Sequence, residues 1–394
     1  MRLILSSMGL IAATYGLARF GYGLFLPQFQ AAFDLDGATA GMIQAGSFLS
    51  YCLAATIAVP GARWPRALVV SAGASASLGS ALIAMAPNAT ALGIGVVVAG
   101  AGAGFATPGT VGLISRLVGE AGRERAQTTV NSGTGVGLVA AGLLLAGTTE
   151  NWRTGWIIIA VTATLATIAT LTSARSGDPR PAPRSGEPAA IARPRPRDFL
   201  ALRRVVAIAL CSGAGSAAVW TFGRTALDGA SPGSFPAQSY SVTAWILLGA
   251  MSVAGALAAR LVQRWSLTVA WSVTNLTMLL GTVGIGLLPG QPVIAFAAIS
   301  LFGVGYTAMT GVLIIWAMRL TPHTPAASTV VLFVALALGQ AMGAWLLGAL
   351  QDFSSTSVMF LAATAIGAVA IAAQPRSVRS HRSEPVHAAM GKSH

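Results

Sequence analysis

Two arginines lie inside long apolar segments of the sequence, where a fixed positive charge is costly. Arg19 lies within the stretch TYGLARFGYGLFLP (14–27), and Arg224 lies toward the end of a second apolar segment. Ionisable side chains at membrane depth are rare and usually face a cavity or a partner. The guanidinium group stays charged and binds carboxylate or phosphate through two parallel hydrogen bonds. The pair therefore predicts a binding site for a small anionic or zwitterionic organic solute.

Aromatic and amide side chains accompany both arginines. Tyr15 and Tyr22 lie at i−4 and i+3 from Arg19, so the three share one face of a helix. Trp220 lies at i−4 from Arg224. We expect aromatic side chains to form the walls of the site and amide side chains to add hydrogen bonds. The full set of candidate substrate-binding residues is Arg19, Tyr15, Tyr22, Gln44, Asn131, Trp220, Arg224, Tyr306 and Gln340.

Structural roles for the same arginines are also open. Arg224 could pair with Asp228 at i+4 as a gate or anchor, and Arg19 could cap helix carbonyls or hold two helices together. None of the eleven carboxylates lies in the middle of an apolar run. This argues against an exporter of cationic drugs, because such a protein needs a buried acid. Asp228, together with Asp34, is the plausible titrating group near the pathway, and we assign both to coupling or gating.

The composition is that of a protein embedded in lipid. Of the 394 residues, 54% are hydrophobic and only 9% are charged, and the mean hydropathy is +0.71, whereas soluble domains carry about 25% charged residues. Apolar runs that are long enough to span a bilayer are expected to be helices, because the backbone finds no other hydrogen-bond partner there. Twelve such runs occur, at 4–27, 40–60, 66–86, 91–117, 126–147, 153–173, 205–228, 240–260, 266–288, 292–317, 326–350 and 355–373.

The segments between these runs divide the chain and orient it. We expect an N-terminal six-helix bundle over 1–173, a cytoplasmic Arg- and Pro-rich linker over 174–204, a C-terminal six-helix bundle over 205–374 and a disordered cytoplasmic tail over 375–394. With the N-terminus inside, all but three of the 24 Arg and Lys residues lie in inner segments, in accord with the positive-inside rule. Both termini of this multi-pass inner-membrane protein are therefore predicted to be cytoplasmic.

The two halves of the sequence repeat each other. GFATPGTVGLISRL (104–117) resembles GYTAMTGVLIIWAMRL (305–320), AQTTV (126–130) resembles AASTV (326–330), and the turn GARWPR (61–66) matches AARLVQR (258–264). Two parallel repeats of six helices, joined by a linker, resemble the plan of major facilitator transporters. NWRTGW (151–156) is similar to an outer-face motif of that family, and YGLARFGYGLFLP resembles the start of its YbfB/YjiJ-like branch.

The resemblance implies a secondary active transporter that works by alternating access. Arg19 and Arg224 lie on the first helix of each half, and in this fold those helices line the central cavity. Protons are a candidate coupling ion through Asp228. The expected partners are the small-molecule substrate and the lipid bilayer, with no nucleic acid, no cofactor and no metal, and the protein is expected to be a monomer.

Two functions other than the transport of an anionic or zwitterionic solute are also open. An exporter of hydrophobic compounds or drugs would bind them on the aromatic walls and use Arg19 structurally, whereas a sensor or scaffold would act through the Arg-rich linker. An enzyme is not indicated, because no nucleophile, base or metal constellation occurs. The glycine-rich stretches GAGAG (100–104) and GTGVG (133–137) lack the pattern of a phosphate-binding loop. They predict close helix packing instead.

Overall fold

The computed structural model describes residues 1–149, 151–175, 196–236, 238–257, 264–321 and 323–373, and their regular structure is entirely helical. The first group of helices comprises α1 (Arg2–Ile11), η1 (Ala12–Arg19), α2 (Phe20–Phe33), α3 (Gly37–Gly61), α4 (Pro65–Ala84), α5 (Ala89–Leu117), α6 (Glu120–Asn131), α7 (Gly133–Gly147) and α8 (Trp152–Arg175). The second group comprises α9 (Pro196–Gly229), α10 (Ser239–Val253), η2 (Ala254–Leu257), α12 (Leu267–Leu287), α13 (Pro292–Leu320), α14 (Pro325–Phe353) and α15 (Thr356–Ala372). The all-α class is confirmed, while the predicted tail and most of the predicted linker lie outside these residues.

Most of these helices have the length and composition of membrane spans. Within the described residues, ten continuous helical stretches are long and apolar enough to cross a bilayer. The first of them, Arg2–Phe33, runs through α1, η1 and α2. Two shorter apolar helices, Ser239–Val253 and Thr356–Ala372, fall on the eighth and twelfth predicted runs. Within the described residues, each of the twelve predicted runs therefore overlaps an apolar helix.

Several helices extend beyond their predicted ends, and α2 and α9 are among them. The first run was expected to stop at Pro27, but α2 continues to Phe33 with that proline inside it. Phe29 packs against the rings of Trp152 and Trp156, with centroids 5.2 and 6.0 Å away. This burial offsets the backbone hydrogen bond that a proline removes. The helix of the seventh predicted run, α9, begins at Pro196, within the segment predicted to be linker. Proline is tolerated at this position because it lies in the first turn of the helix.

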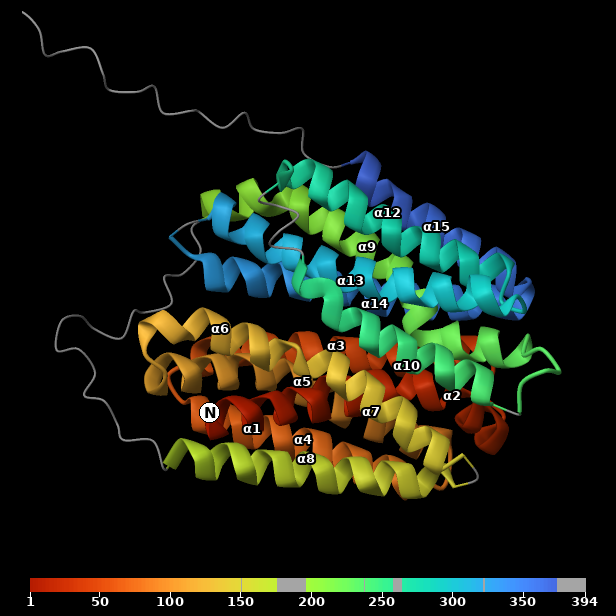
Figure 1. The fold of residues 1–394 in the computed structure, drawn as a ribbon, viewed down its shortest axis with the longest axis horizontal. Coiled ribbons are helices and arrows are strands. Elements are labelled where there is room, and N and C mark those ends of the chain that lie inside the picture. The colour runs from red at the N-terminus through yellow and green to blue at the C-terminus, as the bar shows by residue number, and fades with distance from the viewer. Residues whose placement is uncertain (150, 176–195, 237, 258–263, 322, 374–394) are drawn as a thin grey trace, which may run out of the picture.

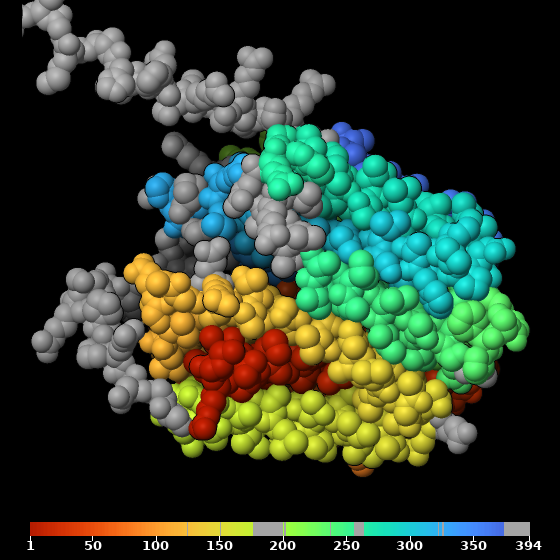
Figure 2. Space-filling model, viewed as in Figure 1, coloured from red at the N-terminus to blue at the C-terminus, as the bar shows by residue number. Residues whose placement is uncertain are grey.

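The two groups of helices meet along three contacts. Figure 1 shows the first group of helices below the second. Where the groups meet, α10 of the second group lies along α7 of the first. The helix α3 packs along α14, and α2 packs against α9. On the face shown in Figure 2, the side chains of α7 (yellow) and α10 (green) form one continuous surface. Residues carried by α2, α3, α9 and α14 are thereby brought together between the groups.

Glycines permit close approaches between helices of the first group, as the sequence predicted for the stretches 100–104 and 133–137. A Cβ atom on Gly137 would collide with the backbone of Ala12, and one on Gly16 would collide with the backbone of Gly137. The segment η1 therefore lies directly against α7. Within α5, Gly104 faces the backbone of Tyr51 on α3 in the same way. Both stretches are helical and tightly packed, and neither is a phosphate-binding loop.

Candidate substrate-binding site

Arg19 is buried at the junction of η1 and α2, with only 4% of its surface exposed. The eight residues Ala12–Arg19 form a π-helix, a rare geometry that often occurs at functional sites. The guanidinium carbon lies 4.0 Å from the centroid of the Tyr51 ring and 5.2 and 5.3 Å from those of Phe20 and Phe48. Its Nη2 donates to Oε1 of Gln340 at 3.3 Å, and its Nε has no hydrogen-bond partner.

Within the part of the chain that the structure describes, no carboxylate forms an ion pair with Arg19. Among the described residues, the ion pair found is the one between Arg224 and Asp228, at 3.9 Å. A buried charge without a counterion costs several kcal/mol, whereas a desolvated cation–π contact returns about 2 kcal/mol. The neutral Gln340 and the aromatic rings therefore compensate the charge only in part. The site favours a ligand that carries a negative charge.

A closed set of contacts joins Arg19 to residues of the second group. Gln340 donates from Nε2 to the hydroxyl of Tyr306 at 3.0 Å and to that of Ser216 at 3.4 Å. The rings of Tyr306 and Trp220 form a T-shaped pair, with centroids 5.0 Å apart. Trp220 in turn stacks on Phe20, the neighbour of Arg19, at 4.1 Å. Four predicted site residues, namely Arg19, Trp220, Tyr306 and Gln340, thus meet from η1, α9, α13 and α14.

The other predicted site residues lie around this set at different distances from it. Tyr15 places its ring 5.7 Å from the Arg19 guanidinium and shares a hydrogen bond of 3.0 Å with Thr107. Tyr22 is fully buried but donates its hydroxyl to the Ala40 carbonyl at 3.0 Å, so it holds α2 to α3. Asn131, at the end of α6, is exposed, and no contact found among the described residues joins it to Arg19.

Gln44 is completely buried, and neither its Nε2 nor its Oε1 has a partner. It precedes Phe48 by one turn and Tyr51 by two turns of α3, so it shares the helix face that meets Arg19. Buried amides are normally hydrogen-bonded, and an unsatisfied one calls for a physical explanation. A ligand bound beside Arg19 would provide it.

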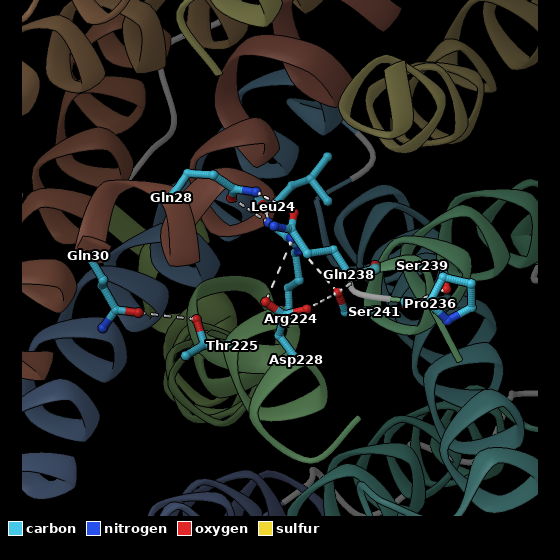
Figure 3. A network of polar contacts seen from close by, with 10 residues as sticks. All are labelled: Leu24, Gln28, Gln30, Arg224, Thr225, Asp228, Pro236, Gln238, Ser239 and Ser241. Carbon is cyan, nitrogen blue, oxygen red and sulfur yellow. Dashed lines mark hydrogen bonds and ion pairs between the residues drawn. The ribbon is translucent and has the colours of Figure 1, made fainter. Parts of the chain in front are cut away.

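Arg224 lies in a separate polar network between α2, α9 and α10 (Figure 3). Its Nη1 donates to the Leu24 carbonyl at 2.5 Å and to Oε1 of Gln28 at 2.6 Å. Its Nη2 and Nε each donate at 3.3 Å, to Oε1 of Gln238 and to the Ser241 hydroxyl. Leu24 lies five residues beyond Arg19, a rise of about 7.5 Å along an α-helix. The two arginines therefore occupy different layers, and the donors of Arg224 are already engaged by protein acceptors.

The two predicted coupling residues differ in their surroundings. Asp228 belongs to the Arg224 network, where its Oδ1 accepts from the Ser241 hydroxyl at 2.8 Å. Asp34 is exposed at the end of α2 and has a left-handed backbone, with φ of 51°, that aspartate tolerates better than most residues. No contact found in the described part of the chain joins Asp34 to the network. The structure therefore brings only one of the two carboxylates to Arg224.

Sequence reasoning did not place Phe48 or Tyr51 beside Arg19, and it did not identify the partners of Arg224. Phe48 and Tyr51 follow Gln44 at i+4 and i+7, a helical spacing that could have indicated them. Gln28 and Gln238 gave no such signal, because they lie 196 and 14 residues from Arg224. Asp352 was also missed.

Asp352 joins the end of α14 to the start of α3. Its two carboxylate oxygens accept from the backbone nitrogens of Gly37 at 2.7 Å and Ala38 at 2.9 Å. Asp36, the N-cap of the same helix, accepts from the nitrogen of Thr39 at 2.7 Å. Hydrogen bonds with Thr39, from its side chain and then its backbone, lower the pKa of Asp36. Two carboxylates therefore complement the positive end of the α3 dipole.

The side chains around Arg19 leave only 4% of its surface exposed. Two hollows found in the described part of the chain are grooves on the apolar exterior, and neither is lined by Arg19. One, of about 380 Å³, lies between α4 and α8, and the other, of about 320 Å³, lies between α3, α4 and α5. Because Arg19 is buried, a solute reaches it only if the groups around it move apart.

The fold and the site thus define an all-helical membrane protein with a buried cationic site between two groups of helices. The chain belongs to the Major Facilitator Superfamily, whose family model matches residues 8–344. This is a family of transporters, so the protein is a membrane transporter and not an enzyme. No curated protein matches the chain.

Solved transporter structures share the fold at low sequence identity. The nucleoside transporter NupG matches with a TM-score of 0.70 and 14% identity over 94% of this chain and 97% of its own. A bacterial homologue of the human lysosomal transporter Spinster, inward-facing and unoccupied, matches with 0.70 and 14% over 94% and 96%. A POT family transporter in complex with 5-aminolevulinic acid matches with 0.73 and 12% over 94% and 93%. At such identities the likeness establishes the fold alone.

Proposed function

We propose that this protein is a secondary active transporter that moves a small anionic or zwitterionic organic solute across the inner membrane by alternating access. The observation that carries the proposal is the burial of Arg19 without a carboxylate beside it, in contact with Tyr51 and Gln340. Since a buried cation needs a counterion, the negative charge of the solute supplies it. The transported solute binds where α2, α3, α9 and α14 meet.

In the proposed membrane arrangement, twelve helices span the bilayer and both termini are cytoplasmic. Two six-helix bundles, 1–173 and 205–374, are joined by the linker and rock about the Arg19 site. The concentration of arginine in the predicted inner turns supports this orientation. The opening stretch YGLARFGYGLFLP supports membership of the YbfB/YjiJ-like branch.

The Arg224 network acts in this scheme as a gate at the predicted outer end. Arg224 joins α2 to α9 and α10 through Leu24, Gln28 and Gln238, so these contacts break when that end opens. Asp228 is the carboxylate through which a proton could be coupled to opening, because protonation would weaken its pairing with Arg224. Asp34, which is exposed at the end of α2, is the second candidate for the same role.

A second function is favoured by the aromatic residues alone. Trp220 contacts Phe20, Trp245, Phe302 and Tyr306, and a wall of this kind suits an exporter of hydrophobic compounds. In that case Arg19 would be structural, held by its cation–π contacts.

Transport by purified protein in proteoliposomes separates the two functions. A thermal-shift screen of small carboxylates, phosphates and amines first selects a ligand, and uptake of that ligand is then measured for wild type, Arg19→Gln and the exposed-site control Arg204→Gln. We expect Arg19→Gln to lower uptake at least about 100-fold, the loss of about 3 kcal/mol from a buried ion pair, and the control to remain near wild type. Full uptake by Arg19→Gln contradicts an anion site.

A further inference from the structure

We infer that the substrate is a monocarboxylate with a flat apolar body, rather than a zwitterion or a dianion. The inference rests on the proposed function and narrows the class of solute that the Arg19 site takes. Four observations support it. Among the described residues, one buried arginine is available to the substrate and no acid is found in contact with it. The unpartnered polar atoms near Arg19 are mostly hydrogen-bond donors, and the surrounding aromatic rings are flat.

One buried cation is available to the substrate. Arg19 and Arg224 are the buried arginines in the described part of the chain. The donors of Arg224 are directed to Leu24, Gln28, Gln238 and Ser241, and Asp228 lies 3.9 Å from it. Arg19 has a single hydrogen bond, to a neutral amide. A second carboxylate on the substrate would therefore be buried without a cation, which is strongly unfavourable.

An ammonium group on the substrate would find no acid at this site. The groups found in contact with Arg19 are the aromatic rings of Tyr15, Phe20, Phe48 and Tyr51 and the amide of Gln340. None of them carries a negative charge, and Arg19 itself repels a cation. An amino acid would therefore place its carboxylate well and its ammonium group badly. This distinguishes an anion from a zwitterion.

The unpartnered polar atoms around Arg19 are mostly donors. Among the described residues, the Nε of Arg19, the Nε2 of Gln44 and the indole nitrogen of Trp220, which stacks on Phe20, are buried without a hydrogen-bond partner, and Oε1 of Gln44 is a free acceptor. A carboxylate offers about four acceptor positions on its two oxygens. A ligand rich in acceptors at one end satisfies more of these groups than a donor-rich ligand such as an amine.

The walls of the site are flat and apolar. Phe20 and Trp220 are stacked, with ring planes inclined by 26°, and Tyr306 and Trp220 form a T-shaped pair. Phe48 and Tyr51 lie on the α3 side of the guanidinium. Aromatic faces pack best against planar groups in offset-stacked or edge-to-face arrangements. The body attached to the carboxylate is therefore planar and apolar.

Four matched small molecules test the inference. Benzoate is a planar monocarboxylate, benzamide is its neutral counterpart, phthalate adds a second carboxylate, and phenylalanine adds an ammonium group. Binding of each is measured by isothermal titration to the purified full-length protein at about pH 7, for wild type, Arg19→Gln and Arg204→Gln. We expect benzoate to bind wild type at least about 10-fold more tightly than the other three. We also expect Arg19→Gln to lose this binding and Arg204→Gln to keep it.

The outcomes that contradict the inference are distinct from those that contradict the proposed function. Phthalate or phenylalanine binding as tightly as benzoate, and only when Arg19 is present, overturns the monocarboxylate and leaves the anion site intact. Benzoate binding that survives Arg19→Gln overturns both, as does benzamide binding as tightly as benzoate. Failure of benzoate to bind wild type at all overturns the inference.

Discussion

At the residue scale, Arg19 and Arg224 show how the same side chain acquires different roles from its neighbours. Arg224 meets carbonyl, amide, hydroxyl and carboxylate oxygens, so its charge and its donors are satisfied within the protein. Arg19 meets aromatic rings and one amide, and its Nε is left without a partner. A guanidinium group in the second kind of environment is poised to bind an anion.

Replacing Gln340 by glutamate supplies the carboxylate that Arg19 lacks. Gln340→Glu places a negative charge at the position of the Oε1 atom that accepts from Arg19, so we expect an internal ion pair that competes with the substrate. Benzoate binding should fall at least about 100-fold, while the melting temperature is maintained or rises. Titration calorimetry and thermal unfolding in detergent measure the two effects.

The neutral variant Gln340→Leu is the matched control. It removes the same hydrogen bond without adding a charge, so we expect a smaller loss, of about 10-fold, in benzoate affinity. Equal losses in the two variants would show that the amide itself, and not charge compensation, governs binding.

The sequence indicated residues that meet in the structure better than it indicated the hydrogen-bond partners of those residues. Arg19, Trp220 and Gln340 stand out because polar or large aromatic groups within apolar runs are uncommon, and each of them does lie in the cluster. The engagement of Arg224 by Gln28 and Gln238 could not be predicted, since no periodicity links residues that meet only through tertiary packing. Asn131 looked equivalent to Gln340 in sequence, yet it is exposed.

At the scale of the elements, the first membrane helix is adapted to hold Arg19. Its π-helical segment lies against α7, where glycines on both sides allow the backbones to touch. The sequence predicted the close packing of 133–137 but not the π-helix, because i→i+5 hydrogen bonds leave no mark in apolar periodicity. The proline at 27 was likewise overridden by the packing of Phe29.

A methyl group on Gly137 should separate η1 from α7. Gly137→Ala places a Cβ against the Ala12 backbone, and overpacking of this kind costs about 1–3 kcal/mol. We expect a lower melting temperature and weaker benzoate binding. Gly147→Ala on the same helix is the control, because nothing lies within 4 Å of a Cβ there. If both variants melt like wild type, the contact between η1 and α7 does not constrain the site.

Removing the Asp352 carboxylate should favour opening at the predicted outer end. Asp352→Ala deletes two charged hydrogen bonds between α14 and α3, and a loss of about 1.5 kcal/mol corresponds to about a 10-fold shift toward the open state. The rate at which maleimide labels a cysteine at the buried position of Gln44, in a background free of Cys52 and Cys211, measures that shift.

Asp36→Asn is the comparison for this experiment. It alters the N-cap carboxylate of the same helix. Unlike Asp352, this carboxylate accepts a hydrogen bond from within α3, from the nitrogen of Thr39. We expect its labelling rate to match wild type. If Asp352→Ala labels no faster than wild type, the contact between α14 and α3 is not part of the gate.

At the scale of the whole molecule, the fold was the most predictable property. Apolar length alone located the helices, because a backbone in lipid has few alternatives, and the internal repeat indicated the superfamily to which the chain belongs. The packing of α3 along α14 and of α7 along α10 was not accessible in this way. It depends on which small and large side chains meet across the two groups.

The proposed orientation is tested by labelling in intact cells. Ser234 and Ala121 are both exposed, and they lie in segments predicted to be outside and inside. In a background free of Cys52 and Cys211, a membrane-impermeant maleimide should label Ser234→Cys in intact cells and Ala121→Cys only after permeabilisation. The reverse pattern contradicts cytoplasmic termini.

The most direct test of the account is the affinity of one anion for three forms of the protein. Titration of benzoate into wild type, Arg19→Gln and Arg224→Gln compares the uncompensated arginine with the one engaged in the gate. We predict that Arg19→Gln weakens binding at least about 100-fold and that Arg224→Gln changes it by less than about 10-fold. Wild-type affinity in Arg19→Gln, or an equal loss in both variants, would contradict the assignment of Arg19 as the cation that binds the substrate.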